Sequence, residues 1–195
     1  MQNFEELAYL FKSSKHNRHL IRLNIKEAAL LYKMVKKSQG DIIEIGRRYG
    51  GSTVLLASAA AEGQTVHSID IERHDFVKKC FRPCPQSVLS KIKLIDAKSH
   101  IIGQKWKGPR VGLVFVDGDH RYKGVKRDIR AWCPKVEIGG YAVFHDVRDK
   151  RREWGLEPLI KALKQCGWKE VDCADSMVVM QKERDMELVL PAKKR

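Results

Sequence analysis

From Gly40 onward, short apolar runs alternate with longer segments in which apolar residues recur at helical spacing. Short runs of this kind are typical of buried parallel strands. The last two apolar runs, 168–174 and 176–182, are separated only by a turn at Asp175, and this connection is too short to contain a crossover helix. The pattern predicts strands over 41–46, 65–71, 91–96, 112–119, 139–147, 168–174 and 176–182.

Helices are expected between most of these strands. In 121–132, Tyr122, Val125 and Ile129 fall on one face of a helix, with basic residues between them. The first 39 residues read as amphipathic and helical, whereas Pro83 and Pro85 interrupt the segment 73–90, which we expect to be a helix or a loop. The remaining predicted helices are 52–61 and 156–166.

Alternating strands and helices predict an α/β fold, a doubly wound and mostly parallel sheet with helices on both faces. The closely spaced final pair of strands requires the last strand to run antiparallel. Ligands of such sheets bind at the carboxyl ends of the strands, where the strand order reverses. We expect an N-terminal helical extension (1–39) packed on a ligand-binding core (40–183), followed by a basic tail (184–195).

Composition narrows the class of protein. The chain has 195 residues, 43% of them hydrophobic and 32% charged, as in a single globular domain. No apolar stretch approaches the ~20 residues that span a membrane, so no membrane partner is expected. The N-terminus carries Glu5 and Glu6 and does not resemble a secretory signal. The five cysteines lack the spacing of a zinc or redox motif. A cytoplasmic protein with reduced thiols is therefore predicted.

The loop after the first strand carries the strongest signal for a ligand. It reads EIGRRYGGST (44–53), a strand followed by a glycine turn and a helix start. A dinucleotide loop needs G-x-G-x-x-G, but Arg48 stands at the second glycine position, and no phosphate-binding Gly-Lys-Ser/Thr follows. S-adenosylmethionine has no phosphate. Glu44 would suit its ammonium group and the open backbone at Gly46 its carboxylate, while Asp70, which ends the second strand, would accept the ribose hydroxyls.

Two acidic and histidine-rich segments follow the fourth and fifth strands. Asp117, Asp119 and His120 end the first of them, and His145 and Asp146 end the second. Neighbouring parallel strands end at the same edge of a sheet, so these side chains should converge. Such a cluster is costly unless it is solvated, paired or metal-bound, which makes it a candidate site.

Three segments together resemble class I methyltransferases of the small O-methyltransferase type: the loop 44–53, SIDIE (68–72) and FVDGDHRYKGVKRDIRAWCPKVEIGGYAVFHDV (115–147). The last is similar to a D-G-x-H-x-Y-x-x-V-x-x-D signature of methyltransferase family 24. The resemblance extends from about Ile25 to about Lys182. It implies a seven-stranded sheet with a reversed last strand and S-adenosylmethionine as cofactor. The residues it places around that cofactor are Glu44, Gly46, Gly50, Ser52, Asp70, Ala97, Lys98 and Asp117.

A hydroxyl acceptor is a poor nucleophile until a base or a cation helps it lose its proton. We expect His120, with Asp117 beside it, to carry the chemistry. Metal-dependent relatives place ligands at positions matching Asp117, His145 and Asp146, but an acid is usual where His145 stands. Since imidazole suits Mn, Fe, Co or Zn better than Mg, either the divalent metal differs or it is absent and His145 is a second acid–base group.

Alternative functions remain open at this point. The net charge of +14 would suit a nucleic-acid methyltransferase or a polyanion-binding module on the same fold. However, DGDH stands where a base-flipping enzyme usually carries an Asn/Asp-Pro-Pro-aromatic tetrapeptide. A small hydroxylated molecule is the expected acceptor. The N-terminal helices and the Pro83–Pro85 segment are expected to form the acceptor pocket or a homodimer contact.

Overall fold

A seven-stranded sheet forms the centre of the computed structural model, which describes residues 3–12, 20–149 and 154–192. The strand order is β3-β2-β1-β4-β5-β7-β6; all neighbours are parallel as far as β5, and β7 runs antiparallel to β5 and β6. The predicted fold class and the reversed last strand are confirmed. The strands are β1 (Asp41–Ile45), β2 (Val66–Asp70), β3 (Ile92–Asp96), β4 (Val111–Val116), β5 (Val136–Phe144), β6 (Trp168–Ala174) and β7 (Met177–Lys182).

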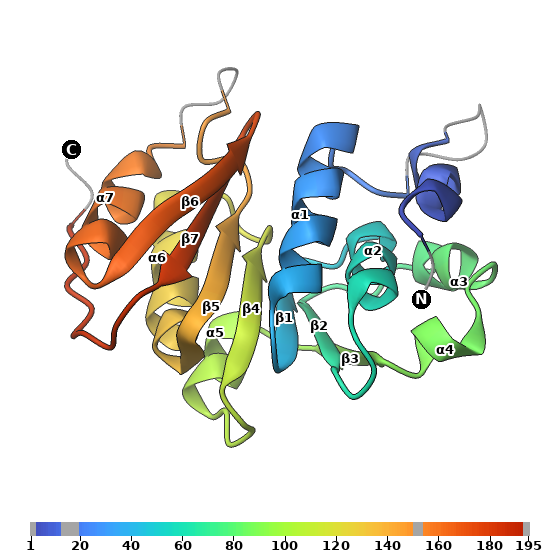
Figure 1. Ribbon diagram of the computed structural model, residues 1–195, viewed down its shortest axis with the longest axis horizontal. Coiled ribbons are helices and arrows are strands. Elements are labelled where there is room, and N and C mark those ends of the chain that lie inside the picture. Colours follow the sequence, from blue (N-terminus) through green and yellow to red (C-terminus); the bar gives the residue numbers. More distant parts are fainter. Residues whose placement is uncertain (1–2, 13–19, 150–153, 193–195) are drawn as a thin grey trace.

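Helices cover both faces of the sheet (Figure 1). One face carries the N-terminal segment and α1 to α4, and the other carries α5 to α7. The helical elements are η1 (Glu5–Phe11), α1 (Ile25–Lys37), α2 (Gly51–Ala59), α3 (Phe76–Phe81), α4 (Gln86–Leu89), α5 (Ser99–Gln104), α6 (Tyr122–Trp132), η2 (Cys133–Lys135) and α7 (Glu157–Gln165).

Alternation along β1 shows how one strand supplies two cores. Ile42 belongs to the hydrophobic cluster that contains residues of α1 and α2, whereas Ile43 belongs to the cluster on the opposite face, which contains residues of α6. Side chains of a strand point to opposite faces in turn, so a continuous apolar run is required where both faces are covered. Glu44 lies on the same side as Ile42, and this side places it beneath α2.

Differences from the predicted elements lie mainly at strand ends. β4 ends at Val116 and β5 at Phe144, so Asp117, His120 and His145 belong to the loops that follow and not to the strands. Asp146 has a φ of 56°, a left-handed conformation that cannot continue a strand. The segment 73–90 forms two short helices, α3 and α4, separated near Pro83 and Pro85. Helix α5 was not predicted.

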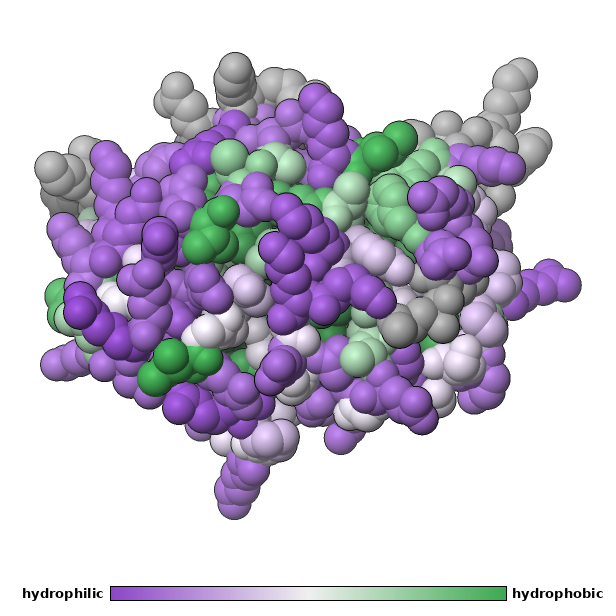
Figure 2. Space-filling view, in the orientation of Figure 1, coloured by the Kyte–Doolittle hydropathy of each residue, from purple (hydrophilic) through white to green (hydrophobic). Residues whose placement is uncertain are grey.

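The surface is largely polar. On the face shown in Figure 2 the hydrophobic residues form small, scattered patches. Among the described residues, no helix has the length and apolar character needed to cross a membrane. The basic tail is described only as far as residue 192; Lys193, Lys194 and Arg195 lie outside the described residues.

Candidate active site

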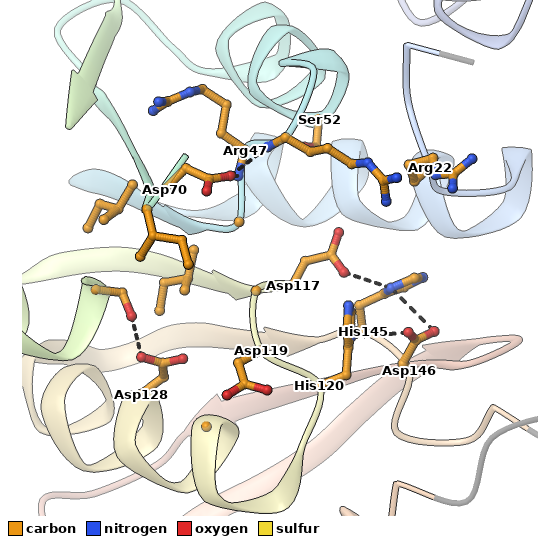
Figure 3. Close-up of a pocket in the computed structure, with 18 of the residues that line it drawn as sticks. Arg22, Arg47, Ser52, Asp70, Asp117, Asp119, His120, Asp128, His145 and Asp146 are labelled. Atoms are coloured by element: carbon orange, nitrogen blue, oxygen red, sulfur yellow. Dashed lines mark hydrogen bonds and ion pairs between the residues drawn. The ribbon is translucent and has the colours of Figure 1, made fainter. Parts of the chain in front are cut away.

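A cavity of about 1430 Å³ opens at the carboxyl ends of the parallel strands. The ends of β1 and β2, the loops after β1 to β5, and side chains of α1 and α6 line it, and many of these side chains are polar (Figure 3). Two of the sequence-predicted residues, Glu44 and Gly50, are not among its lining residues. Those that do line it are Gly46, Ser52, Asp70, Ala97, Lys98, Asp117, His120, His145 and Asp146.

Gly46 permits the close approach of two strand-end loops. Its φ is 95°, and a Cβ built there would lie 2.3 Å from the carbonyl oxygen of Asp117. Any side chain would therefore push the loop after β1 away from the loop after β4. Gly50 adopts a φ of 88° as the residue that precedes α2, which also favours glycine. The glycines shape the cavity wall through the backbone.

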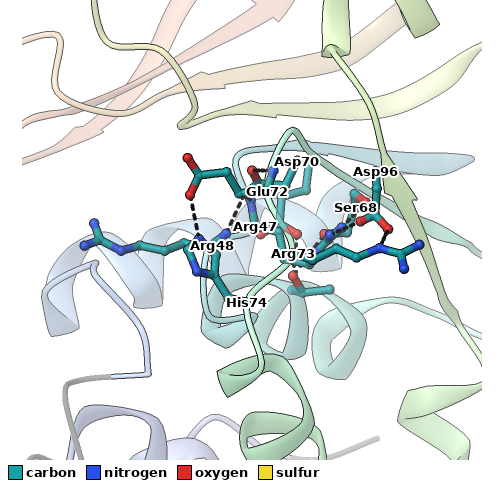
Figure 4. A network of polar contacts seen from close by, with 10 residues as sticks. Arg47, Arg48, Ser68, Asp70, Glu72, Arg73, His74 and Asp96 are labelled. Atoms are coloured by element: carbon teal, nitrogen blue, oxygen red, sulfur yellow. Dashed lines mark hydrogen bonds and ion pairs between the residues drawn. The ribbon is translucent and has the colours of Figure 1, made fainter.

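Asp70 holds this loop in place (Figure 4). Its Oδ2 accepts hydrogen bonds from the backbone N–H groups of Arg47 (2.9 Å) and Arg48 (2.7 Å), and its Oδ1 accepts one from Glu72 N–H (2.9 Å). The buried Arg47 side chain donates to the carbonyl of Ser68 at 2.8 Å and pairs with Asp96 at 2.5 Å. The ends of β1, β2 and β3 are thus linked into one rigid edge.

Glu44 lies behind the loop and not in the cavity. Its side chain is fully buried, and its Oε2 accepts a hydrogen bond from Thr53 of α2 at 2.5 Å. Burial raises the pKa of Glu44 to about 7, although hydrogen bonds from Ser52, Ser68 and Thr53 oppose the shift. In this structure Glu44 therefore supports the start of α2 from below.

His145 lies at the centre of a carboxylate cluster. Its Nδ1 is 2.8 Å from Asp117 Oδ1 and 3.4 Å from Asp146 Oδ1, and its Nε2 is 3.3 Å from Glu27 Oε2. Burial works to lower the pKa of His145, but the charge of Asp117 and the hydrogen bonds to Asp117 and Glu27 outweigh it and raise that pKa. The predicted convergence of the two strand-end segments is present.

Glu27 is a site residue that the sequence reasoning missed. It lies in the first turn of α1, is 3% exposed, and accepts hydrogen bonds from the hydroxyl (2.6 Å) and the backbone N–H (3.2 Å) of Ser176. Burial opposes ionisation, yet hydrogen bonds from His145 and Ser176 lower the pKa of Glu27. A signal that could have found it is the spacing Asn24-x-x-Glu27, but this spacing is explained equally well by the capping box that these two residues form at the start of α1.

His120 is held by Asp146 at one ring nitrogen. Its Nδ1 is 3.1 Å from Asp146 Oδ2, and its ring lies 5.7 Å from that of Trp154. No hydrogen bond to its Nε2 is formed by any residue in the described part of the chain. A carboxylate at Nδ1 favours the tautomer whose Nε2 lone pair is available, which is the arrangement of an oriented general base.

The donor set also bears on a metal. Ligand atoms of Asp117, His120 and His145 lie within 4.8 Å of one another. One carboxylate and two imidazoles suit Mn, Fe, Co or Zn and not Mg, which prefers oxygen ligands. Glu27 at the Nε2 of His145 would then orient a histidine bound through Nδ1, as outer carboxylates do in many metal sites. The residues fit a transition metal. Asp146, expected from the sequence as a ligand, is not in this group.

Comparison with known proteins identifies the family. The model of a methyltransferase domain family, Methyltransf_24, matches residues 43–147. The chain belongs to this family. The match begins within β1 and ends just after Asp146, so it includes the glycine loop, Asp70 and both strand-end segments. Glu27 of α1 lies outside the matched range. The chain thus carries a methyltransferase domain, as the sequence resemblance implied.

Solved structures with the same fold include two O-methyltransferases. NovP superimposes with a TM-score of 0.70 at 16% identity, covering 92% of this chain and 88% of that protein. TomG from Streptomyces achromogenes, an enzyme of tomaymycin synthesis determined in complex with SAM, gives 0.67 at 14% identity, covering 91% and 94%. At these identities the likeness establishes the fold of the methyltransferase, not its acceptor.

A curated relative matches a shorter part of the chain. The uncharacterized protein R132 of Acanthamoeba polyphaga mimivirus is 34% identical over 53 residues. The match covers 27% of this chain and 24% of that protein. About a quarter of the relative's length is therefore shared.

Proposed function

We propose that this methyltransferase transfers the methyl group of S-adenosylmethionine to a hydroxyl oxygen of a small-molecule acceptor. The observation that carries the proposal is the continuity of one cavity from Asp70 and the glycine loop to His120, whose Nε2 is available as a base. A cofactor bound at Asp70 and the glycine loop would present its methyl carbon near His120. An acceptor entering from solvent would complete the site.

The cofactor would lie along the strand ends. Asp70 would receive the ribose hydroxyls, and the backbone around Gly46 together with Ser52 at the start of α2 would receive the methionine carboxylate. Asp117 would lie beside the sulfonium, whose positive charge its carboxylate stabilises. Ala97 and Lys98 would contact the adenine. Glu44 and Gly50 would act indirectly, by supporting and shaping the turn before α2.

S-adenosylmethionine, when bound, would supply a methyl group: the acceptor oxygen would bond to the methyl carbon as the carbon–sulfur bond breaks, and the electron pair would stay on sulfur in the neutral thioether of S-adenosylhomocysteine. His120 Nε2 takes the hydroxyl proton as the oxygen attacks, and Asp146 stabilises the imidazolium that results. Alignment of the acceptor with the methyl group can lower the barrier by roughly 7–11 kcal/mol.

A divalent transition metal is the second way in which the acceptor could be activated. Asp117, His120 and His145 would hold it, and it would lower the pKa of a bound acceptor hydroxyl. His120 would then be a ligand and not the base. The two arrangements predict different effects of EDTA: turnover should be lost if a metal held by Asp117, His120 and His145 activates the acceptor, and should persist if His120 is the base.

We also propose that the protein works in the cytoplasm on a small molecule. All five cysteines are free, and four of them are buried, a state that a reducing compartment maintains. Nucleic acid is the less favoured acceptor, because no base-flipping motif follows β4.

The test combines binding with a transfer assay. Calorimetry should show binding of S-adenosylmethionine and S-adenosylhomocysteine but not of NAD. A screen of catechols, phenols, sugars and hydroxy acids should follow, each with EDTA and with Mn, Co, Zn or Mg. Transfer of a labelled methyl group to a hydroxyl acceptor supports the proposal. Binding of NAD while both sulfur nucleosides are refused would overturn it.

A further inference from the structure

The signature segment after β4 contains a buried carboxylate that the proposed function does not use. Asp128, in the middle of α6, is 4% exposed, yet it lines the cavity at the end away from His145 and Asp146 (Figure 3). Burial raises its pKa to about 6. A desolvated carboxylate is costly unless its oxygens accept hydrogen bonds, so its partners define its role.

One oxygen of Asp128 has a partner in the protein and the other does not. Oδ1 accepts a short hydrogen bond from the Ser99 hydroxyl. Oδ2 receives no hydrogen bond from the described residues. It is not one of the fully buried atoms without a partner, so part of its surface is accessible, and the cavity that Asp128 lines is where it is exposed. Ser99 is itself fixed, since its carbonyl accepts a hydrogen bond from the indole of the fully buried Trp132 at 3.2 Å. The result is a rigid acceptor aimed at a ligand.

The place of Asp128 relative to the strand ends indicates which part of the ligand it meets. Asp70 pairs in register with Asp96, and Ala97, Lys98 and Ser99 follow directly. A nucleoside with its ribose at Asp70 and its sulfonium at Asp117 must extend its base toward these residues. Ile71, 69% exposed and lining the same cavity, offers an apolar surface for a flat ring.

We propose that Asp128 accepts a hydrogen bond from the exocyclic amino group of adenine and thereby selects adenine over 6-oxo purines. The inference rests on the proposed function, because it requires S-adenosylmethionine in this cavity. Adenine presents an amino donor at its 6-position, whereas hypoxanthine presents a carbonyl acceptor that would face the carboxylate without a proton between them. A site built to hydrogen-bond a polar group rejects an analogue that leaves the site's own group unpaired.

Asp128→Asn tests this role without removing the contact to Ser99. An asparagine carbonyl can still accept from the Ser99 hydroxyl, and its amide N–H then faces the cavity as a donor suited to a 6-oxo base. Calorimetry would compare S-adenosylhomocysteine with S-inosylhomocysteine for the wild type and the variant. The wild type should prefer the adenosyl compound by roughly 10²-fold. The variant should lose roughly tenfold or more for it and gain affinity for the inosyl compound.

Asp119→Asn is the matched control. Asp119 also lines the cavity, but both its oxygens are taken up by Arg121, at 2.8 and 3.0 Å. Removing its charge should change the affinities for the two nucleosides by the same factor. If Asp128→Asn also changes the affinities for the two nucleosides by the same factor, the inference is overturned and Asp128 has only a structural role at Ser99.

A second measurement needs no variant. An S-adenosylhomocysteine analogue with an N6,N6-dimethyl amino group lacks any donor hydrogen, and the wild type should bind it at least about tenfold more weakly. Equal binding of the dimethyl and parent compounds would refute the role of Asp128 even if Asp128→Asn does not fold. Refusal of S-adenosylhomocysteine itself by the wild type would instead refute the proposed function, so the two failures can be told apart.

Discussion

Individual polar side chains in this cavity each have a fixed partner on another element of the fold. Asp146 orients His120, Glu27 and Asp117 hold His145, and Ser99 holds Asp128. Partners of this kind remove rotamer freedom before a ligand arrives, and pre-organised groups are the ones that stabilise a transition state effectively. Single substitutions should therefore separate binding from chemistry.

His120→Gln should lower kcat by 10²- to 10⁴-fold, which is the usual contribution of a general base. The affinity for S-adenosylhomocysteine should change by less than about threefold, because His120 meets the acceptor and not the nucleoside in our proposal. Steady-state kinetics and calorimetry measure the two effects. A proportional loss of both kcat and cofactor affinity would show that His120 supports the fold of the site instead.

Glu44 should make the stability of the wild type fall as the pH rises. In the folded protein the pKa of Glu44 is about 7, above its ordinary value of 4.5, so the folded state binds the proton more tightly than the unfolded state does. The stability that this proton contributes is complete below pH 4.5 and is lost as the pH rises through about 7. Glu44→Gln keeps an acceptor for Thr53 but carries no buried charge. From pH 5 to pH 9 the variant should gain up to about 3 kcal/mol relative to the wild type in urea unfolding. A relative gain by the wild type would mean that a cation stabilises the carboxylate.

At the scale of elements, the glycine turn between β1 and α2 decides whether the cavity forms. Gly46 and Gly63 provide a matched pair, since both have a positive φ, 95° and 83°, but only Gly46 faces another backbone. Gly63→Ala should cost about 1 kcal/mol from backbone strain alone. Gly46→Ala adds the clash with Asp117 O and should cost roughly 3 kcal/mol or more. Urea unfolding gives both values.

Cofactor affinity should distinguish these two variants further. Gly46→Ala must displace the loop that carries Asp117, so S-adenosylhomocysteine should bind at least about tenfold more weakly, while Gly63→Ala should bind it as the wild type does. Equal affinity in the two variants would show that the approach of the loops after β1 and β4 does not shape the binding site.

The elements that the sequence predicted well are those with a strong local signal. The apolar runs that became β1, β4 and β7 are buried on both faces, so their hydrophobicity is continuous. Helix α5 was missed because SHIIGQ is too short to show a helical period. Glu44 does not line the cavity, and alternation with Ile43 and Ile45 places it on the opposite side of β1 from these two residues.

The site was predictable as far as it is built from strand ends. Asp117 and His145 converge because neighbouring parallel strands end at one edge, a rule that needs no tertiary information. Glu27 and Asp128 could not be assigned this way. Both come from helices, and which side chain of a helix reaches the cavity depends on how that helix packs. Glu27, for example, accepts a hydrogen bond from Ser176, 149 residues away in the sequence.

At the scale of the whole molecule, the net charge of +14 contrasts with a cavity rich in carboxylates. Nine carboxylates and seven Lys or Arg side chains line the cavity, so the positive excess of the chain lies elsewhere. The charge excess therefore attracts polyanions to the outside of the protein without directing them into the site. Binding of nucleic acid and methyl transfer should be separable properties.

Single-stranded RNA should bind the protein weakly and lose at least about tenfold in affinity between 50 and 200 mM salt, because such binding is driven by counterion release. S-adenosylhomocysteine carries no net charge, so its affinity should change by less than about twofold over the same range. Filter binding and calorimetry measure the two, and labelled methyl groups should not enter the RNA. Salt-resistant binding accompanied by methylation of the RNA would instead make nucleic acid the acceptor. The proposal of a small-molecule acceptor would then be wrong, whereas the proposed cofactor would be unaffected.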